Sequence, residues 1–369
     1  MYDVIVIGGG PAGTSAAITC VRSGASVLLL ERGRFPRHKV CGEFVSAESL
    51  DLLRDLLATQ YAQLLPAAIR IPQSRIFLDG RTLHAAVDPA AVSIARFDLD
   101  ATLWQSAQEG GVACRQQASV QSVSGAGPFL VKTSGGEFES RALIIASGRS
   151  SNLTSNLTSA FSDGADSRPK WIGLKGHFAE TSPPASVDLY FFDGGYCGVQ
   201  PVNLAGEVER PGRINACAMV RADVATTLPE VFVRYPQLRQ RSRGWKALSD
   251  PVTTSPLIFH EPQPESDGIL LVGDAAAFVD PFVGDGISLA LRSGRMAGDS
   301  LIPFFAGTIP LPEAALNYRA SYEQRLVPVF RTSSKIRRML SLPRTVRTPI
   351  LRLLEKSPRI TRYVVSKTR

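Results

Sequence analysis

Residues 2–33 read YDVIVIGGGPAGTSAAITCVRSGASVLLLERG, and this stretch decides the fold. The apolar run from Val4 to Ile7 predicts a buried strand, and the glycines after it predict a tight turn. The small and apolar residues that follow predict a helix that stops at Gly24. A second apolar run, Val27 to Leu30, predicts another buried strand. Strand, glycine turn, helix and strand together indicate the start of a βαβ unit.

The turn in this stretch carries glycines with the spacing Gly8-x-Gly10-x-x-Gly13. Glycines at these positions allow a tight turn, a close approach of the backbone to a pyrophosphate and close packing of the helix. Glu31 ends the second strand, where a carboxylate can accept hydrogen bonds from an adenosine ribose. The pattern therefore predicts a dinucleotide site, with a vestigial glycine turn as the alternative.

A second glycine-rich segment, near the other end of the chain, favours FAD over NAD. Asp274 follows a buried strand, where an acid can hold ribityl hydroxyls. The pattern Pro-x-x-Gly-x-Gly then leads into a helix and comprises Pro281, Gly284 and Gly286, with Ile287 near the start of the helix. Amides at a helix N-terminus can approach a flavin ring and stabilise its reduced, anionic form. Asp274 alone could be a helix cap, but the two segments together predict FAD.

Composition excludes several classes of protein. The chain has 369 residues, of which 44% are hydrophobic, and predicts an enzyme-sized protein of two joined domains. Its five cysteines are scattered and odd in number, which argues against a disulfide framework and a CxxC metal site, so we expect no metal and a reducing, cytoplasmic location. No apolar run approaches the ~20 residues of a membrane span, and only Met1 precedes the first strand.

The net charge of +8 is unevenly distributed. The tail from Arg325 to Arg369 holds thirteen Lys or Arg and one acid, Glu355, so it carries +12 and the remainder carries −4. We expect no nucleic-acid partner. Apolar residues recur in this tail at helical spacing, which predicts packing onto the flavin domain, with peripheral contact to anionic lipid at the inner face of the membrane as the alternative.

The remaining pattern predicts an α/β protein of mixed type. Helical spacing follows residue 46, a hairpin is expected to turn at Asp79-Gly80, and a small meander precedes Gly148. We expect a Rossmann-like FAD-binding domain, an inserted β-rich substrate domain and a helical C-terminal cap. Their expected ranges are 1–68, 96–165 and 264–325 for the first, 69–95 and 166–263 for the second, and 326–369 for the third.

These motifs resemble the FAD-binding fold shared by p-hydroxybenzoate hydroxylase, flavin-dependent halogenases and geranylgeranyl reductases. The resemblance rests on GGGPAG with Glu31, on GDAAAFVDPFVGDG and on Arg96 before a helix, and it covers most of the chain. Ser147-Gly148 replaces the Asp-Gly of many aromatic hydroxylases, which argues against tight docking of NAD(P)H, a candidate electron donor. The resemblance implies that FAD contacts Gly8, Gly10, Gly13, Glu31, Arg32, Lys39, Cys41, Gly42, Arg96, Gly148, Asp274, Pro281, Gly284, Gly286 and Ile287.

Residues 35–46, FPRHKVCGEFVS, contain Pro36-x-x-Lys39-x-Cys41-Gly42, which is similar to the segment of geranylgeranyl reductases that passes beside the isoalloxazine. Gly42 permits a close approach of the backbone to the ring, and Lys39 can offset flavin or pyrophosphate charge. Cys41 is a candidate proton donor. The alternative is that Cys41 is a small packed hydrophobe, the usual fate of a free cysteine.

The substrate wall departs from these families. The chain lacks Trp-x-Trp-x-Ile-Pro, which disfavours tryptophan-type halogenation. Where geranylgeranyl reductases have aromatic-x-Trp-x-aromatic-Pro, this chain keeps Tyr196 but has Gly198 and Gln200 in place of large rings, which predicts a broader pocket. Tyr196 and His177 are candidate catalytic acids or bases, and each could instead be an ordinary strand residue.

Three functions remain open on the sequence. The leading one is an FAD-dependent monooxygenase that hydroxylates a small apolar or aromatic metabolite. The second is a reductase that saturates a double bond of an isoprenoid lipid, with Cys41 as proton donor. The third is a prenyl-binding protein of the Rab dissociation inhibitor type, which Glu31 and Asp274 argue against.

Overall fold

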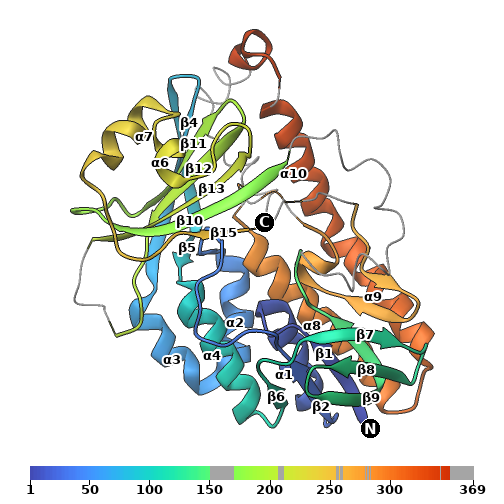
Figure 1. The fold of residues 1–369 in the computed structure, drawn as a ribbon. Coiled ribbons are helices and arrows are strands. Elements are labelled where there is room, and N and C mark those ends of the chain that lie inside the picture. Colours follow the sequence, from blue (N-terminus) through green and yellow to red (C-terminus); the bar gives the residue numbers. More distant parts are fainter. Residues whose placement is uncertain are drawn as a thin grey trace.

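The computed structural model describes residues 1–149, 170–206, 212–254, 257, 261–278, 280, 282, 284–340 and 342–349. Within these residues the chain forms two sheets, of eight and nine strands, with helices around them (Figure 1). The longer helices are α1 (Pro11–Arg22), α2 (Leu50–Leu57), α4 (Arg96–Glu109), α8 (Gly286–Phe305), α9 (Leu311–Arg325) and α10 (Val327–Leu340). The shorter ones are α3 (Tyr61–Leu64), α6 (Leu228–Phe232) and α7 (Pro236–Arg241).

The first sheet contains eight strands, and its central path runs β16-β17-β9-β1-β2-β6. Its strands are β1 (Tyr2–Ile7), β2 (Val27–Leu30), β6 (Ala113–Arg115), β7 (Val120–Ser124), β8 (Phe129–Thr133), β9 (Gly136–Ile145), β16 (Glu265–Ser266) and β17 (Ile269–Leu271). β1 pairs in parallel with β2, with Val4 opposite Val27, and the predicted opening βαβ unit is confirmed. Residues 4–6 and 142–145 have no exposed surface, as expected for parallel strands covered on both faces.

Small residues bring α8 close to α1. A Cβ added to Gly294 would lie 2.1 Å from the carbonyl oxygen of Ala12, and one added to Gly298 would lie 2.7 Å from the Cβ of Thr19. The Ser15 hydroxyl also donates to the carbonyl of Leu291 at 2.7 Å. This contact sets the N-terminal ends of both helices on the same side of the sheet.

The second sheet contains nine strands in the order β14-β10-β13-β12-β11-β4-β5-β3, with β15 beside β10. They are β3 (Phe44–Val45), β4 (Ile69–Leu78), β5 (Arg81–Ser93), β10 (Trp171–Ala179), β11 (Ser186–Phe192), β12 (Gly195–Pro201), β13 (Arg213–Arg221), β14 (Lys246–Ala247) and β15 (Val252–Thr253). The hairpin between β4 and β5 turns at Asp79 and Gly80, as predicted, with φ of 53° and 75°. The division into domains stays a prediction; β3 of the second sheet comes from the range 1–68 that was expected in the FAD-binding domain.

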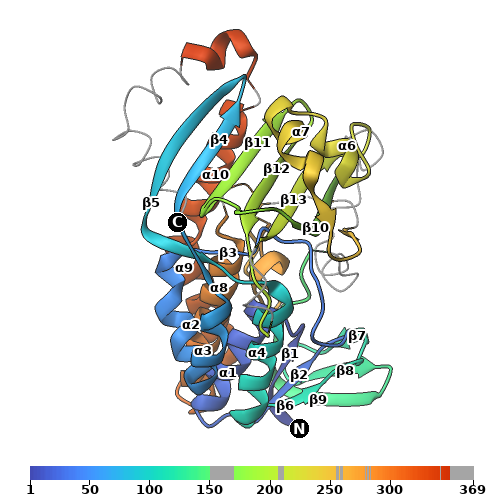
Figure 2. The ribbon, with the colours of Figure 1, turned by 90° about the vertical axis from the view of Figure 1, so that its left-hand side faces the viewer.

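The described part of the C-terminal tail packs against the second sheet. α10 runs from the first sheet towards the β4–β5 hairpin (Figure 2), where Leu340 contacts the cluster of Leu78 and Leu83. Arg347 binds Asp79 through two hydrogen bonds of 2.6 Å. The apolar side of α10 therefore faces protein; residues 350–369 of the predicted cap lie outside the described residues. Among the described helices, none is both long and apolar enough to cross a membrane.

Candidate flavin site and its surroundings

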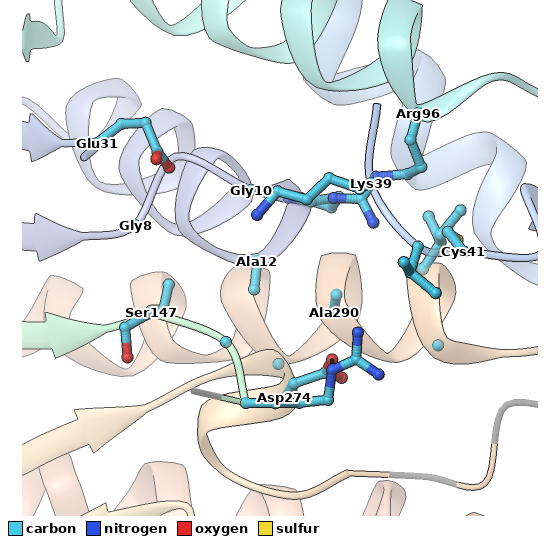
Figure 3. A pocket seen from close by; sticks show the side chains of 18 of the residues that line it. Gly8, Gly10, Ala12, Glu31, Lys39, Cys41, Arg96, Ser147, Asp274 and Ala290 are labelled. Atoms are coloured by element: carbon cyan, nitrogen blue, oxygen red, sulfur yellow. Dashed lines mark ion pairs between the residues drawn. The ribbon is translucent and has the colours of Figure 1, made fainter. Parts of the chain in front are cut away.

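A cavity of about 730 Å³ lies at the carboxyl edge of the parallel strands. The residues that directly follow four of these strands line the cavity: Gly8 after β1, Glu31 after β2, Ala146 after β9 and Val272 after β17. Ligands bind at this edge in open α/β sheets, in pockets of roughly 300–1,000 Å³. Figure 3 shows Glu31 at one end of the cavity and Cys41 at the other, with Lys39 and Arg96 between them.

Most of the residues predicted to contact the cofactor line this cavity. Those that do are Gly8, Gly10, Glu31, Arg32, Lys39, Cys41, Gly42, Arg96, Gly148, Asp274, Gly284, Gly286 and Ile287. Gly13 does not, because it faces the turn: a Cβ there would lie 1.8 Å from the carbonyl oxygen of Gly8. Pro281 lies outside the described residues.

Glu31 is held at its end of the cavity as a buried carboxylate. It accepts hydrogen bonds from the amides of Gly9 at 3.0 Å and Gly33 at 2.8 Å, and from Arg37 at 2.8 Å. Burial alone would raise the pKa of Glu31, but the Gly33 amide, Arg37 and the Gly9 amide lower it below the ordinary value. The carboxylate therefore stays ionised, as an acceptor for ribose hydroxyls requires.

Cations gather at the middle of the cavity. Burial and the positive charges of Arg37 and Arg96 together lower the pKa of Lys39 to about 8. Arg96 is fixed there by Asp100, whose carboxylate accepts two hydrogen bonds of 2.6 Å. Neighbouring cations disfavour the charged form of the half-buried Lys39 side chain, so an anionic ligand would stabilise it. A pyrophosphate bound between Glu31 and Cys41 would supply this negative charge. The residues thus fit FAD.

The N-terminus of α8 approaches the other end of the same cavity. A Cβ added to its first residue, Gly286, would meet no atom within 4 Å, so the backbone amides there are open to a flat ring. The preceding residue, Asp285, accepts a hydrogen bond from Ser46 at 2.8 Å, and burial raises the pKa of Asp285 to about 6. This bond ties the helix end to the segment that follows Cys41.

Cys41 lies on the cavity wall, and its sulfur has polar neighbours. The Glu43 amide donates to Sγ at 3.3 Å, while Asn215 donates to the Cys41 carbonyl at 2.9 Å. Burial opposes ionisation of Arg96, but Asp100 and then the Cys41 sulfur raise its pKa above the ordinary value, so the guanidinium and the thiol are close enough to interact. Cys41 is only partly buried and lines the cavity, and it also packs against the core of the first sheet.

His177 does not line the cavity but belongs to a buried cluster behind it. Its Nε2 lies 2.8 Å from a carboxylate oxygen of Glu43, whose other oxygen binds Lys175 and accepts the Arg96 amide at 2.8 Å. Glu43, Lys175 and His177 are at most 1% exposed. Burial would raise the pKa of Glu43, but Lys175 and His177 lower it to about 2. The Glu43 carboxylate thus links three parts of the chain: the loop that contains Cys41 (the Cys41 loop), the start of α4, and β10.

The prediction from sequence missed this cluster, although part of it left a signal. Lys175 and His177 are two residues apart in β10, so they lie on one face of an otherwise apolar strand. Two polar residues on a buried face require a partner, but nothing in the spacing identifies Glu43, 132 residues from Lys175.

Tyr196 also lies outside the cavity lining. It packs against Phe191 and Phe282, with ring centroids 5.4 and 6.1 Å away. Burial raises the pKa of Tyr196 well above its ordinary value, and it raises the pKa of the neighbouring Asp280 to about 6. Gln200, expected to widen the pocket, is buried and donates to Ser93 at 2.7 Å. The side chains of Tyr196 and Gln200 are thus packed within the protein and do not line the cavity. A catalytic role for Tyr196 stays a prediction.

Comparison with known proteins supports the cofactor and the fold. A family model for FAD dependent oxidoreductases matches residues 3–36. The chain is 27% identical over 330 residues to a menaquinone reductase of Mycobacterium tuberculosis, covering 81% of this chain and 76% of that protein. It is 27% identical over 315 residues to digeranylgeranylglycerophospholipid reductase 2 of Methanopyrus kandleri, with shares of 81% and 76%.

Two further likenesses are broader. Conditioned medium factor receptor 1 of Dictyostelium discoideum is 23% identical over 340 residues, which cover 83% of this chain but only 64% of the receptor. The solved structure of the flavin-dependent brominase Bmp2 superposes with a TM-score of 0.77 at 21% identity, covering all of this chain and 93% of that one. This second likeness concerns the fold.

The fold and the cavity define an FAD-binding α/β protein with a second, β-rich sheet over the cofactor edge. The family-model match and the likeness to the two reductases support an FAD-dependent oxidoreductase.

Replacing Asp274 with alanine is expected to weaken FAD binding while the fold is kept. Its carboxylate lines the cavity and is one-third exposed, so it can accept hydrogen bonds from ribityl hydroxyls without holding the core together. Hydrogen bonds to a charged group contribute about 1.5–3 kcal/mol, which corresponds to a Kd raised roughly 10- to 100-fold. Calorimetric titration of FAD into apoprotein measures this, with circular dichroism as the check on folding.

The control is Asp299→Ala, since Asp299 pairs with Arg295 on the exposed side of α8, away from the cavity. Equal affinity for FAD in the Asp274 and Asp299 variants would contradict the role of Asp274. A wild-type protein that is colourless and does not take up added FAD would contradict flavin binding itself.

Proposed function

We propose that this protein is an FAD-dependent reductase that saturates a carbon–carbon double bond of an isoprenoid lipid. The observation that carries the proposal is the Cys41 thiol on the cavity wall, at the end opposite Glu31, with the Glu43 amide and the Arg96 guanidinium beside it. The relatives at 27% identity include two reductases, one of menaquinone and one of digeranylgeranylglycerophospholipid, as their names state.

Different residues along the cavity would bind different parts of FAD. Glu31 would hold the adenosine ribose, Lys39 and Arg96 the pyrophosphate, and Asp274 the ribityl chain, and Gly42 and Gly286 would leave room for the ring. When bound and reduced, FAD supplies two electrons and one hydrogen to the first carbon of the double bond. The second carbon needs a proton. Cys41 would break its S–H bond and give that proton, leaving a thiolate.

The remaining parts of the proposal concern the surroundings. NAD(P)H is proposed as the electron donor. An isoprenoid substrate resides in membranes, so the protein would act at the inner face of the cytoplasmic membrane, with residues 350–369 as the segment for lipid contact. Flotation with neutral and with anionic vesicles tests this part, and equal, negligible binding to both would remove it.

Anaerobic single-turnover kinetics test the proposed reaction. Protein reduced with one equivalent of dithionite is mixed, without oxygen, with a prenylated naphthoquinone that carries a two-isoprene side chain, or with geranylgeraniol. The expected results are return of the oxidised flavin spectrum and a product heavier by two hydrogens in the side chain. For the naphthoquinone, reduction of the ring alone gives the same mass, so fragmentation must place the hydrogens.

Two other outcomes point to the alternatives left open by the sequence. Flavin reoxidation and hydroxylated product only when oxygen is admitted would support the monooxygenase that the sequence favours. Tight binding of geranylgeraniol by protein without flavin, with no product under any condition, would support the prenyl-binding alternative.

A further inference from the structure

His38 lies on the cavity wall, in contact with His177 of the buried cluster of Glu43, Lys175 and His177. Its side chain lines the cavity, three residues before Cys41. Its ring centroid is 5.1 Å from that of His177, with the planes at 86°, and 4.9 Å from that of Phe97. Phe97 and His177 thus hold the ring from two sides.

One nitrogen of this ring is not used by the fold. Nδ1 of His38 and Nδ1 of His177 are both buried, and neither has a hydrogen-bond partner in the part of the chain that the structure describes. Buried polar atoms are nearly always hydrogen-bonded, so an exception calls for an explanation such as a catalytic role. A half-buried imidazole on a cavity wall is suited to proton transfer.

The neighbouring ionisable groups are already engaged. Lys175 and the Nε2 of His177 bind Glu43, and Arg96 binds Asp100. Lys39 points towards Gly10 in Figure 3, away from Cys41. His38 lines the same cavity as Cys41, three residues away in the chain, and has a ring nitrogen without a hydrogen-bond partner among the described residues.

His38 is uncharged at neutral pH. Burial lowers its pKa below 6.5, and the positive charges of Lys175, His177 and Arg213 act in the same direction, while Glu43 opposes them. A neutral imidazole donates from one nitrogen and accepts at the other. It can therefore pass a proton on without a lasting change in its own charge.

We propose that His38 returns a proton to Cys41 after each turnover, an inference that rests on the proposed function. Once Cys41 has given its proton to the substrate carbon, an N–H bond of His38 breaks and a new S–H bond forms. The other ring nitrogen takes a proton from solvent, so the ring ends neutral. Per double bond, the reduced flavin loses two electrons, and one proton from solvent reaches the product through His38 and Cys41.

The first test separates the first turnover from later ones. The assay uses excess dithionite and a prenylated naphthoquinone as probe. In His38→Asn, the rate of the first turnover is expected to stay within about threefold of the wild-type rate, because Cys41 starts protonated. Later turnovers are expected to be about 100-fold slower, a typical loss for a missing acid or base. Added imidazole should restore part of the later rate. His84→Asn is the matched control, because His84 is exposed on β5.

The second test does not need substrate or flavin. Alkylation of Cys41 in apoprotein by iodoacetamide is followed against pH by peptide mass spectrometry. If His38 exchanges a proton with Cys41, His38→Asn should shift the pH of half-maximal alkylation upwards by at least about half a unit, since the thiol loses a base that accepts its proton. His84→Asn should leave it unchanged.

Three results would overturn or separate the inferences. An unchanged alkylation profile in His38→Asn overturns the role of His38. A first turnover slowed as much as the later ones, with normal FAD content, also overturns it and assigns a structural role instead. If the wild type reduces no double bond but the alkylation profile still shifts, the proposed function fails while the proton exchange between His38 and Cys41 stands.

Discussion

Replacing Glu43 with glutamine is expected to lower the free energy of unfolding by about 3–5 kcal/mol, because it leaves the buried ammonium of Lys175 without a counter-charge. Lys175 is 1% exposed and has Glu43 as its ion-pair partner. The loss should also free the Cys41 loop, since the same carboxylate accepts the Arg96 amide. Urea unfolding followed by tryptophan fluorescence measures the change.

The matched control is Glu137→Gln. Glu137 also pairs with a lysine, Lys132, but both side chains are half exposed, and a surface pair of this kind contributes about 1 kcal/mol or less. The double variant Glu43→Gln, Lys175→Met should recover part of the loss, because it removes both buried charges. A Glu43→Gln variant as stable as Glu137→Gln would show that the cluster does not hold the two parts together.

The same cluster predicts how acid acts on the protein. The folded pKa of Glu43 is about 2 against an ordinary value of 4.5, so the unfolded chain binds the proton first as pH falls. The stabilisation by Glu43 is therefore complete above pH 4.5 and is lost as pH falls towards 2. The difference in urea midpoint between wild type and Glu43→Gln should shrink between pH 6 and pH 3.

Local signals in the sequence were enough to predict the cofactor half of the fold. The βαβ start and the helix that begins at Gly286 depend on glycines and apolar runs a few residues apart, as does the turn at Asp79-Gly80 in the second sheet, and all three are found in the structure. Thirteen of the fifteen residues expected at the cofactor line one cavity, because they stand at strand ends and helix starts that the parallel sheet brings to one edge.

The polar surroundings of Cys41 could not be predicted in this way. Glu43 meets His177 across 134 residues, and that contact depends on how β10 crosses the Cys41 loop, which no local pattern encodes. The same is true of His38, whose neighbours come from α4 and β10. The sequence therefore placed His177 beside the substrate, while the structure places it behind the cavity wall and His38 in front.

Replacing Cys41 with alanine is expected to slow the anaerobic reoxidation of reduced flavin by a prenylated substrate by about 10²–10⁴-fold, the usual contribution of a general acid. The thiol lines the cavity; Ser at this position would nearly keep its size, and both Ser and Ala would remove its acidity. Stopped-flow absorbance measures the rate in a single turnover. The control is Cys217→Ala, because Cys217 lies near Cys41 but does not line the cavity.

Cys41→Ala also distinguishes the hydroxylase from the reductase, because the thiol has a different role in each. In a hydroxylase, oxygen reacts at the flavin and Cys41 only shapes the cavity, so Cys41→Ala should change oxygen-dependent reoxidation by less than about tenfold, or ~1.4 kcal/mol. In a reductase, Cys41→Ala removes the proposed proton donor, so the anaerobic rate falls while FAD content and unfolding stay as in the wild type. An anaerobic rate that is equal in Cys41→Ala and Cys217→Ala would remove Cys41 as the acid, and with it the observation on which the reductase proposal rests.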